Sequence, residues 1–138
     1  MKTNIEIYAT ELTQISDKKT HCRATVRLQL EKLDFNGITT QEMINIIRRR
    51  FKYINDKGEF IVETTTTCLD SDIFDKQKGL YIAETKMQRN AYIKGAKMII
   101  YLYKYLQTKF ANQIKNIISG CENAVLDATT HIVELDYK

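Results

Sequence analysis

The chain has 138 residues, of which 43% are hydrophobic and 28% charged, with 21 lysines and arginines against 17 aspartates and glutamates. It contains no proline, no tryptophan and three cysteines. These values exclude collagen-like, disulfide-rich and proline-linker architectures, as well as a disordered or membrane-embedded chain. The length suits one domain, and residues 1–138 are expected to form a single α+β domain.

The first segments of the chain alternate between apolar and polar residues in the manner of β-strands. Residues 4–12 place their apolar side chains on one side, which predicts a half-buried strand. Residues 22–31 alternate over ten positions, so one face should lie on a core and the other near water. Residues 13–19 between them are polar and turn-like, and the two strands are expected to pair as an antiparallel hairpin.

A helix and a third strand are predicted next. Thr39 and Glu42 have the spacing of a capping box, so a helix should begin at about Thr40. Residues 59–69 contain four consecutive threonines, which are poor helix formers and favour a strand. Positive side chains suit the end of the predicted helix because of its dipole. Three arginines occupy its last turns: Arg48, Arg49 and Arg50.

The remainder of the chain is predicted to be helical. No proline interrupts residues 76–119, whose apolar stripe fits one long basic helix with Gly95 as the place for a kink. Ser119-Gly120 resembles a C-terminal cap, after which a last helix within residues 120–138 would fold back. The expected order is therefore β-β-α-β-α-α. Residues 1–75 would form the strands and the first helix. The strands, about three of them, would make a small antiparallel sheet that packs on the helices.

Positive charge is concentrated in the long helix. Residues 76–118 carry nine lysines and arginines and a single acidic residue, Glu84. Residues 1–75 have a net charge of −1, and residues 119–138 a net charge of −3. This asymmetry indicates what kind of partner the protein has rather than how it folds.

Several of these cations recur on one side of the helix. At 100° per residue, four lysines fall within about 20° of one another: Lys86, Lys97, Lys104 and Lys115. Arg89 lies about 60° to the side. Of these cations, the candidate ligand-binding residues are Lys86, Arg89, Lys97 and Lys104, and Arg48–Arg50 form a second patch. A basic ridge can follow the phosphates of a nucleic acid, and tyrosines can stack on its unpaired bases. Alternatively, the lysines only solvate the outer face, the tyrosines pack, and the acidic C-terminal helix covers part of the ridge. The segment contains five tyrosines: Tyr81, Tyr92, Tyr101, Tyr103 and Tyr105.

The middle of the long helix predicts an assembly. Residues 98–106 are apolar in every direction around the helix, and such a helix is buried on all sides. One small sheet covers only one face, so a second face should contact the C-terminal helix or another subunit. A homo-oligomer is therefore expected.

The sequence holds no motif of a catalytic or nucleotide-binding site. Gly-x-Gly-x-x-Gly, Walker-type, Gly-x-Ser-x-Gly and His-Glu-x-x-His segments are all missing. His21 and Cys22 are neighbours in a predicted strand and should face opposite sides, which does not suit a shared site. Asp70, Asp72 and Asp75 lack the glycine and glutamate of an EF-hand loop, and helix capping is their expected role. No cofactor or metal is expected, and catalysis is not favoured.

Compartment is indicated by the cysteines and by the apolar runs. The cysteines are odd in number and widely spaced, so buried reduced thiols are expected. The N-terminus lacks the apolar core of a signal peptide, and the longest apolar run, residues 98–103, is too short to cross a bilayer. These features predict a cytoplasmic protein that does not bind membranes.

One stretch carries a resemblance to a known group of proteins. Cys68, at the end of the third predicted strand, is followed by Asp72-Ile-Phe74-Asp75, by Lys78-Gly79 and by Ile82-Ala83 at the opening of the basic helix. This pattern resembles one found in small, mostly uncharacterised phage-encoded proteins. The resemblance implies a phage or mobile-element source, and therefore the cytoplasm of a host cell, and it carries no established activity.

The sequence as a whole favours a non-enzymatic, phage-like binding protein that acts as an oligomer. Its ligand would be anionic, either nucleic acid or a small nucleotide. The alternative is a structural or protein-interaction component, such as a virion part or an inhibitor of a host protein. In that case the long helix is an assembly element and its lysines are only solvated.

Overall fold

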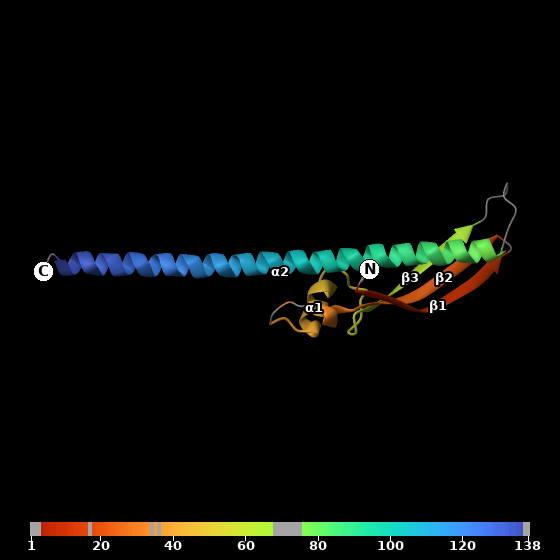
Figure 1. The fold of residues 1–138 in the computed structure, drawn as a ribbon, viewed down its shortest axis with the longest axis horizontal. Helices are drawn as coiled ribbons and strands as arrows, with labels where there is room; N and C mark the ends of the chain where they lie inside the picture. The colour runs from red at the N-terminus through yellow and green to blue at the C-terminus, as the bar shows by residue number, and fades with distance from the viewer. Residues whose placement is uncertain (1–3, 17, 34, 36, 68–75, 137–138) are drawn as a thin grey trace. The chain divides into compact units, whose positions relative to one another are not determined.

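The computed structural model describes residues 4–16, 18–33, 35, 37–67 and 76–136. The three strands form one antiparallel sheet in the order β1-β2-β3 (Figure 1). The α+β class is confirmed, as is the order β-β-α-β-α. The elements are β1 (Ile5–Ser16), β2 (Lys19–Leu28), a short 3₁₀ helix (Leu30–Lys32), α1 (Thr40–Arg48), β3 (Glu59–Thr67) and α2 (Lys76–Asp136).

The chain divides into two compact units, Met1–Leu102 and Tyr103–Lys138. The first unit holds the sheet, α1 and the first part of α2. The second unit consists of the remaining part of α2. Among the described residues, no helix combines the length and the apolar character needed to cross a membrane.

In the first unit, β2 is the central strand and supplies the core of the sheet. The predicted alternation is confirmed, because Cys22, Ala24, Val26 and Leu28 are fully buried. The first part of α2 packs on this inner face, and the Thr64 hydroxyl donates a hydrogen bond of 3.0 Å to the carbonyl oxygen of α2 residue 83. Five side chains in this part of α2 are buried: Ala83, Met87, Ala91, Met98 and Leu102.

The hairpin is longer than the sequence predicted. Residues 13–16 were expected to be a turn, yet they belong to β1, and Thr13 pairs with His21. This end of β1 is exposed on both faces, so no apolar alternation marks it as a strand. The register shifts between Tyr8 and Glu11, and Ala9 there has a φ of +52°. A residue in this left-handed conformation is typical of a β-bulge.

Helix α1 begins where its capping box predicted. The Glu42 backbone N–H donates a hydrogen bond of 3.2 Å to the Thr39 side-chain oxygen, and the helix starts at the next residue. Met43, Ile44 and Ile47 are buried, so the apolar stripe of α1 is part of the core.

Helix α2 continues farther than predicted. It runs through Ser119-Gly120 to Asp136, so the expected cap and the separate C-terminal helix are wrong. A glycine within a helix costs only about 1 kcal/mol relative to alanine. Ser119-Gly120 has neither a proline nor a turn segment after it, and the apolar periodicity continues beyond it. The helix therefore has no break at which its last part could fold back.

Candidate nucleic-acid interface

Within residues 76–102, the side of α2 that faces away from the sheet carries basic and aromatic side chains, together with the exposed Ile93 and Ile100. Lys86, Arg89 and Lys97 are all exposed. Tyr81 and Tyr92 are 71% and 42% exposed. The structure therefore brings three of the predicted cations to solvent on one element, together with two aromatic rings. We call these five residues the outer face of α2.

The outer face has a simple arrangement around the helix axis. At 100° per residue, Lys86 and Lys97 share one line, while Tyr81 and Tyr92 share another line about 140° away. Arg89 falls between the two lines. Arg89 is therefore the cation beside the rings, whereas Lys86 and Lys97 lie on the other flank of the outer face. A ring next to a cation suits a stacked base and its phosphate on a single strand.

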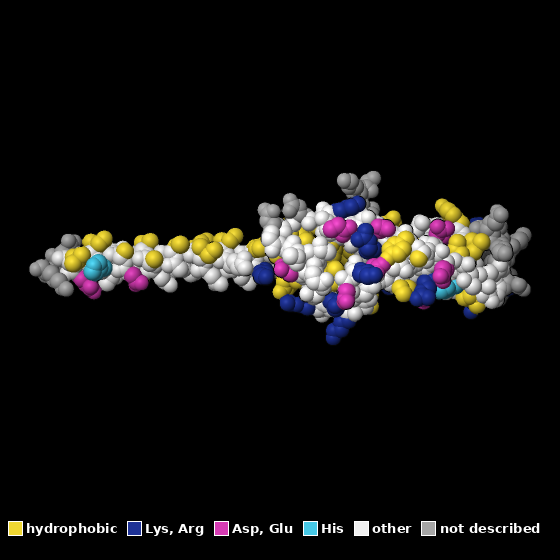
Figure 2. Space-filling view, turned by 90° about the horizontal axis from the view of Figure 1, so that it is seen from below, with side chains coloured by type: hydrophobic (Ala, Val, Ile, Leu, Met, Phe, Trp, Pro, Cys, Tyr) yellow, Lys and Arg dark blue, Asp and Glu magenta, His cyan; other side chains and the backbone are white. Residues whose placement is uncertain are grey.

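The charges of the outer face are not neutralised within the protein. In the described part of the chain, Lys86, Arg89 and Lys97 form no ion pair with a carboxylate. The solvent side of the sheet differs, because Arg23 pairs with Glu63 at 3.3 Å. On the face that Figure 2 shows, basic side chains are interspersed with acidic ones. The outer face of α2 is thus a surface of uncompensated positive charge.

Arg27 is the best-partnered cation on the solvent side of the sheet. It contacts Glu6 at 3.1 Å and Glu31 at 3.2 Å. The hydrogen bond from Arg27, with a second one from Gln29, holds the pKa of Glu6 below its ordinary value. Arg27 therefore links β1, β2 and the 3₁₀ helix and has no free charge for a ligand.

The second predicted patch is divided by the structure. Arg48 is a structural residue, since its guanidinium contacts Asp56 at 2.7 Å and donates to the Ile54 carbonyl oxygen at 3.2 Å. Arg49 is exposed at the end of α1. Arg50 is exposed too, and its guanidinium carbon lies 5.9 Å from the centre of the Tyr101 ring.

The tyrosines of α2 have two different roles. Tyr101 is half-buried and packs edge-on against Phe51, with ring centres 5.9 Å apart. Tyr103 is exposed and belongs to the second unit, as does the exposed Lys104. Lys104 is therefore not grouped with the outer face, which lies wholly in the first unit.

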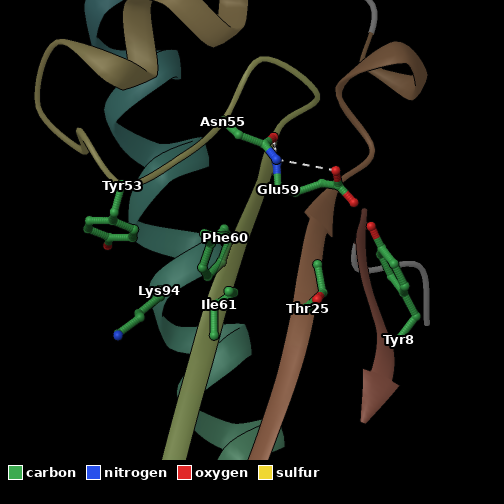
Figure 3. Close-up of a pocket in the computed structure, with 8 residues that line it drawn as sticks. All are labelled: Tyr8, Thr25, Tyr53, Asn55, Glu59, Phe60, Ile61 and Lys94. Carbon is green, nitrogen blue, oxygen red and sulfur yellow. Dashed lines mark hydrogen bonds between the residues drawn. The ribbon is translucent and has the colours of Figure 1, made fainter.

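A hollow of about 720 Å³ is a site that the sequence did not reveal. The Lys94 ammonium lies 5.8 Å from the Tyr53 ring centre, and burial raises the pKa of Tyr53. Figure 3 shows the Asn55 amide donating to the Glu59 carboxylate, a bond of 3.3 Å. The lining comes from β1, β2, β3, α2 and the loop after α1, so no local spacing could have indicated it. Its residues are Tyr8, Thr25, Tyr53, Asn55, Glu59, Phe60, Ile61 and Lys94.

The histidines, cysteines and acidic residues of the described ranges are the candidate metal ligands and reactive groups. No group of three His, Cys, Asp or Glu side chains is placed there to hold a metal ion. Cys22 is buried and His21 faces the other side, 3.9 Å from Glu63. Cys121 is exposed, so the expectation of a buried thiol is wrong at this position. Cys68 and the aspartates of residues 70–75 lie outside the described residues.

Comparison with protein-family models, with curated proteins and with solved structures finds no match for this chain. The geometry of its own residues is therefore what supports a function.

Proposed function

We propose that this protein is a non-enzymatic, phage-like binding protein that engages single-stranded nucleic acid through the outer face of α2. The observation that carries the proposal is the exposure of Lys86, Arg89 and Lys97 without carboxylate partners, beside two exposed tyrosines. When exposed cations neutralise phosphates, the counterions condensed on the nucleic acid are released, and this release favours binding. The proposed location is the cytoplasm of a host cell, where Cys22 and Cys121 would stay reduced.

Single strands are favoured over duplexes by the position of the aromatic rings. Tyr81 and Tyr92 present their rings to solvent on the same side of α2 as Arg89. Stacking needs unpaired bases, and each stacked base contributes about 1–3 kcal/mol. A duplex would use the cations alone. Binding should therefore be tighter to a single strand than to a duplex of the same length.

The test is titration of a fluorescently labelled single-stranded oligonucleotide, read by anisotropy at 50 mM salt. The triple variant K86Q/R89Q/K97Q should lose most of the affinity. The control K32Q/K52Q/K57Q removes three exposed lysines from the rest of the first unit and has the same net charge. Equal loss in both variants, or no binding by the wild-type protein, would contradict the proposal.

Substitution of the tyrosines separates stacking from simple charge attraction. Tyr92→Ala should weaken binding to the single strand about tenfold or more and leave duplex binding nearly unchanged. Tyr53→Ala, an exposed tyrosine outside the outer face, is the control. If a millimolar mononucleotide displaces the oligonucleotide completely, the ligand is a small nucleotide and the nucleic-acid proposal fails.

A structural or protein-interaction role is the second candidate. It is favoured by the large apolar side chains that the second unit exposes to solvent, among them Ile114, Ile117 and Val125. Monomeric proteins seldom expose extended apolar surfaces of this kind. This observation concerns residues 103–136 only and is compatible with ligand binding by the first unit.

A further inference from the structure

From residue 107 onward, the second unit is a helix whose described apolar side chains are exposed to solvent. Every residue from 107 to 135 is exposed. In Figure 2 the apolar side chains of this segment form a row along one side of the helix, and acidic side chains lie on the other. An isolated helix is marginally stable in water unless an apolar face packs against something. These exposed apolar side chains therefore need another protein surface to pack against.

The spacing of the row is that of a coiled coil. Eight consecutive positions separated alternately by three and four residues are all apolar. They are Ala111, Ile114, Ile118, Cys121, Val125, Ala128, Ile132 and Leu135. The pattern is a strict seven-residue repeat over nearly four heptads, with a positions beginning at residue 111 and d positions at residue 114. A strict repeat of seven favours a left-handed supercoil of helices over packing on a globular surface.

The start of the repeat falls inside the second unit. Continued backward, the same register would place Gln107 and Lys104 at the preceding d and a positions. In a coiled coil the a and d side chains form the seam along which the helices meet. Polar residues at both of these positions would interrupt an apolar seam. The seam therefore begins at Ala111.

We infer that residues 111–135 form a parallel, in-register coiled coil with the same residues of a second copy of this chain. A seam of this kind is complementary to itself, because the a and d side chains of one helix fill the holes between those of an identical helix. Three of the four a positions, Ile118, Val125 and Ile132, are β-branched, and one d position, Leu135, is leucine. β-Branched residues at a with leucine at d are what parallel two-stranded coils favour. The inference is independent of ligand binding by the first unit.

Charge supports the parallel orientation. Glu122 occupies an e position, and in a parallel pair its neighbour at the partner's g position is the apolar Ile117. In a fully overlapped antiparallel pair, e positions face each other, so Glu122 would lie beside its own copy. Like charges placed together in this way are destabilising. The parallel pair avoids that repulsion.

Two adjacent residues provide a matched test. Val125 and Leu126 are 67% and 64% exposed, yet only Val125 lies in the seam. By sedimentation at about 50 µM, the wild-type chain should be an oligomer, Val125→Glu a monomer, and Leu126→Glu an oligomer like the wild type. A monomeric wild type, or equal effects of the two substitutions, would overturn the inference.

Orientation is tested by a thiol at one end of the seam. In a C68S/C121A background, Leu135→Cys should be joined to its copy by a short bismaleimide, because parallel helices bring both thiols to the same layer. Thr130→Cys, on the side opposite the seam, should not be joined. Absence of the Leu135→Cys product, or equal yields from both variants, would overturn the parallel register. Neither assay contains nucleic acid, so failure of the ligand proposal would not affect them.

Discussion

A β-carbon at Gly95 would lie 2.6 Å from Cδ1 of Ile5, much closer than two unbonded carbon atoms approach. It would also lie 3.4 Å from Cδ2 of Leu28. Gly95 thus allows α2 to approach β1 and β2 closely, and the buried Ala83 and Ala91 continue the same stripe of small residues. This close approach lets the buried side chains of α2 pack on the sheet, and the outer face of α2 is left toward solvent.

Gly95→Ala should lower the free energy of unfolding by about 1 kcal/mol. Overpacking costs roughly 1–3 kcal/mol, and alanine returns about 1 kcal/mol of helix propensity. Ile5→Val removes the clashing Cδ1 atom, so the double variant should lose less than the sum of the single variants in urea unfolding. Gly120→Ala is the control, since nothing lies within 4 Å of its added carbon, and it should raise helix stability. Strictly additive losses would refute the contact.

Thr39→Ala should destabilise the first unit by about 1 kcal/mol, because the Glu42 N–H loses its capping acceptor. Thr39→Ser keeps an oxygen at the same place and should retain most of the stability. Chemical denaturation of both variants measures the difference. Equal behaviour of the alanine and serine variants would show that the cap contributes nothing.

Arg48 and Arg50 should respond differently to the same change. Arg48→Gln should cost about 1 kcal/mol of stability, a value that allows for the solvent exposure of the pair with Asp56. Arg50→Gln removes an exposed charge and should change stability little. Thermal melting compares the two variants. If Arg50→Gln is the more destabilising one, the assignment of Arg48 as the structural arginine is wrong.

The hydrogen bond from Arg27 to Glu6 should make the free energy of unfolding decrease at acidic pH. Because the folded protein holds the pKa of Glu6 below its ordinary value, this carboxylate adds stability above the ordinary carboxyl range. That contribution is lost as the pH falls through the lowered pKa. Arg27→Gln should therefore reduce the drop in urea midpoint between pH 6 and pH 3. Lys52→Gln, which removes an exposed cation, should leave the drop unchanged, and the same drop in Arg27→Gln would contradict the assignment.

The strongly patterned elements could be predicted from the sequence. The alternation in β2, the capping box at Thr39 and the threonine-rich β3 are local signals, and each was confirmed. The extension of β1 and the continuation of α2 through Ser119-Gly120 were missed, because exposed polar residues carry no periodicity and one glycine is too weak to end a helix. Gly95 was read as a place for a kink, whereas its packing against Ile5 is a tertiary contact invisible to local reasoning.

The candidate site was only partly predictable. Helical rotation grouped Lys86, Lys97 and Lys104, with Arg89 to the side, and the structure leaves all four exposed. Lys104 belongs to the second unit. From its spacing, Arg48 was predicted to bind a ligand like the other cations, because its ion-pair partner Asp56 lies across a loop and gives no local signal. The hollow beside Tyr53 was invisible for a similar reason, since five segments of the chain contribute to its lining.

The dependence of single-strand affinity on salt tests the proposed function most directly. For single strands, the slope of log K against log salt is about −0.7 for each phosphate neutralised. Removal of the three cations in K86Q/R89Q/K97Q should therefore make the slope shallower by about 2 between 50 and 200 mM salt. The control K32Q/K52Q/K57Q should keep the wild-type slope. The same slope in the wild type and K86Q/R89Q/K97Q would contradict binding by the outer face of α2.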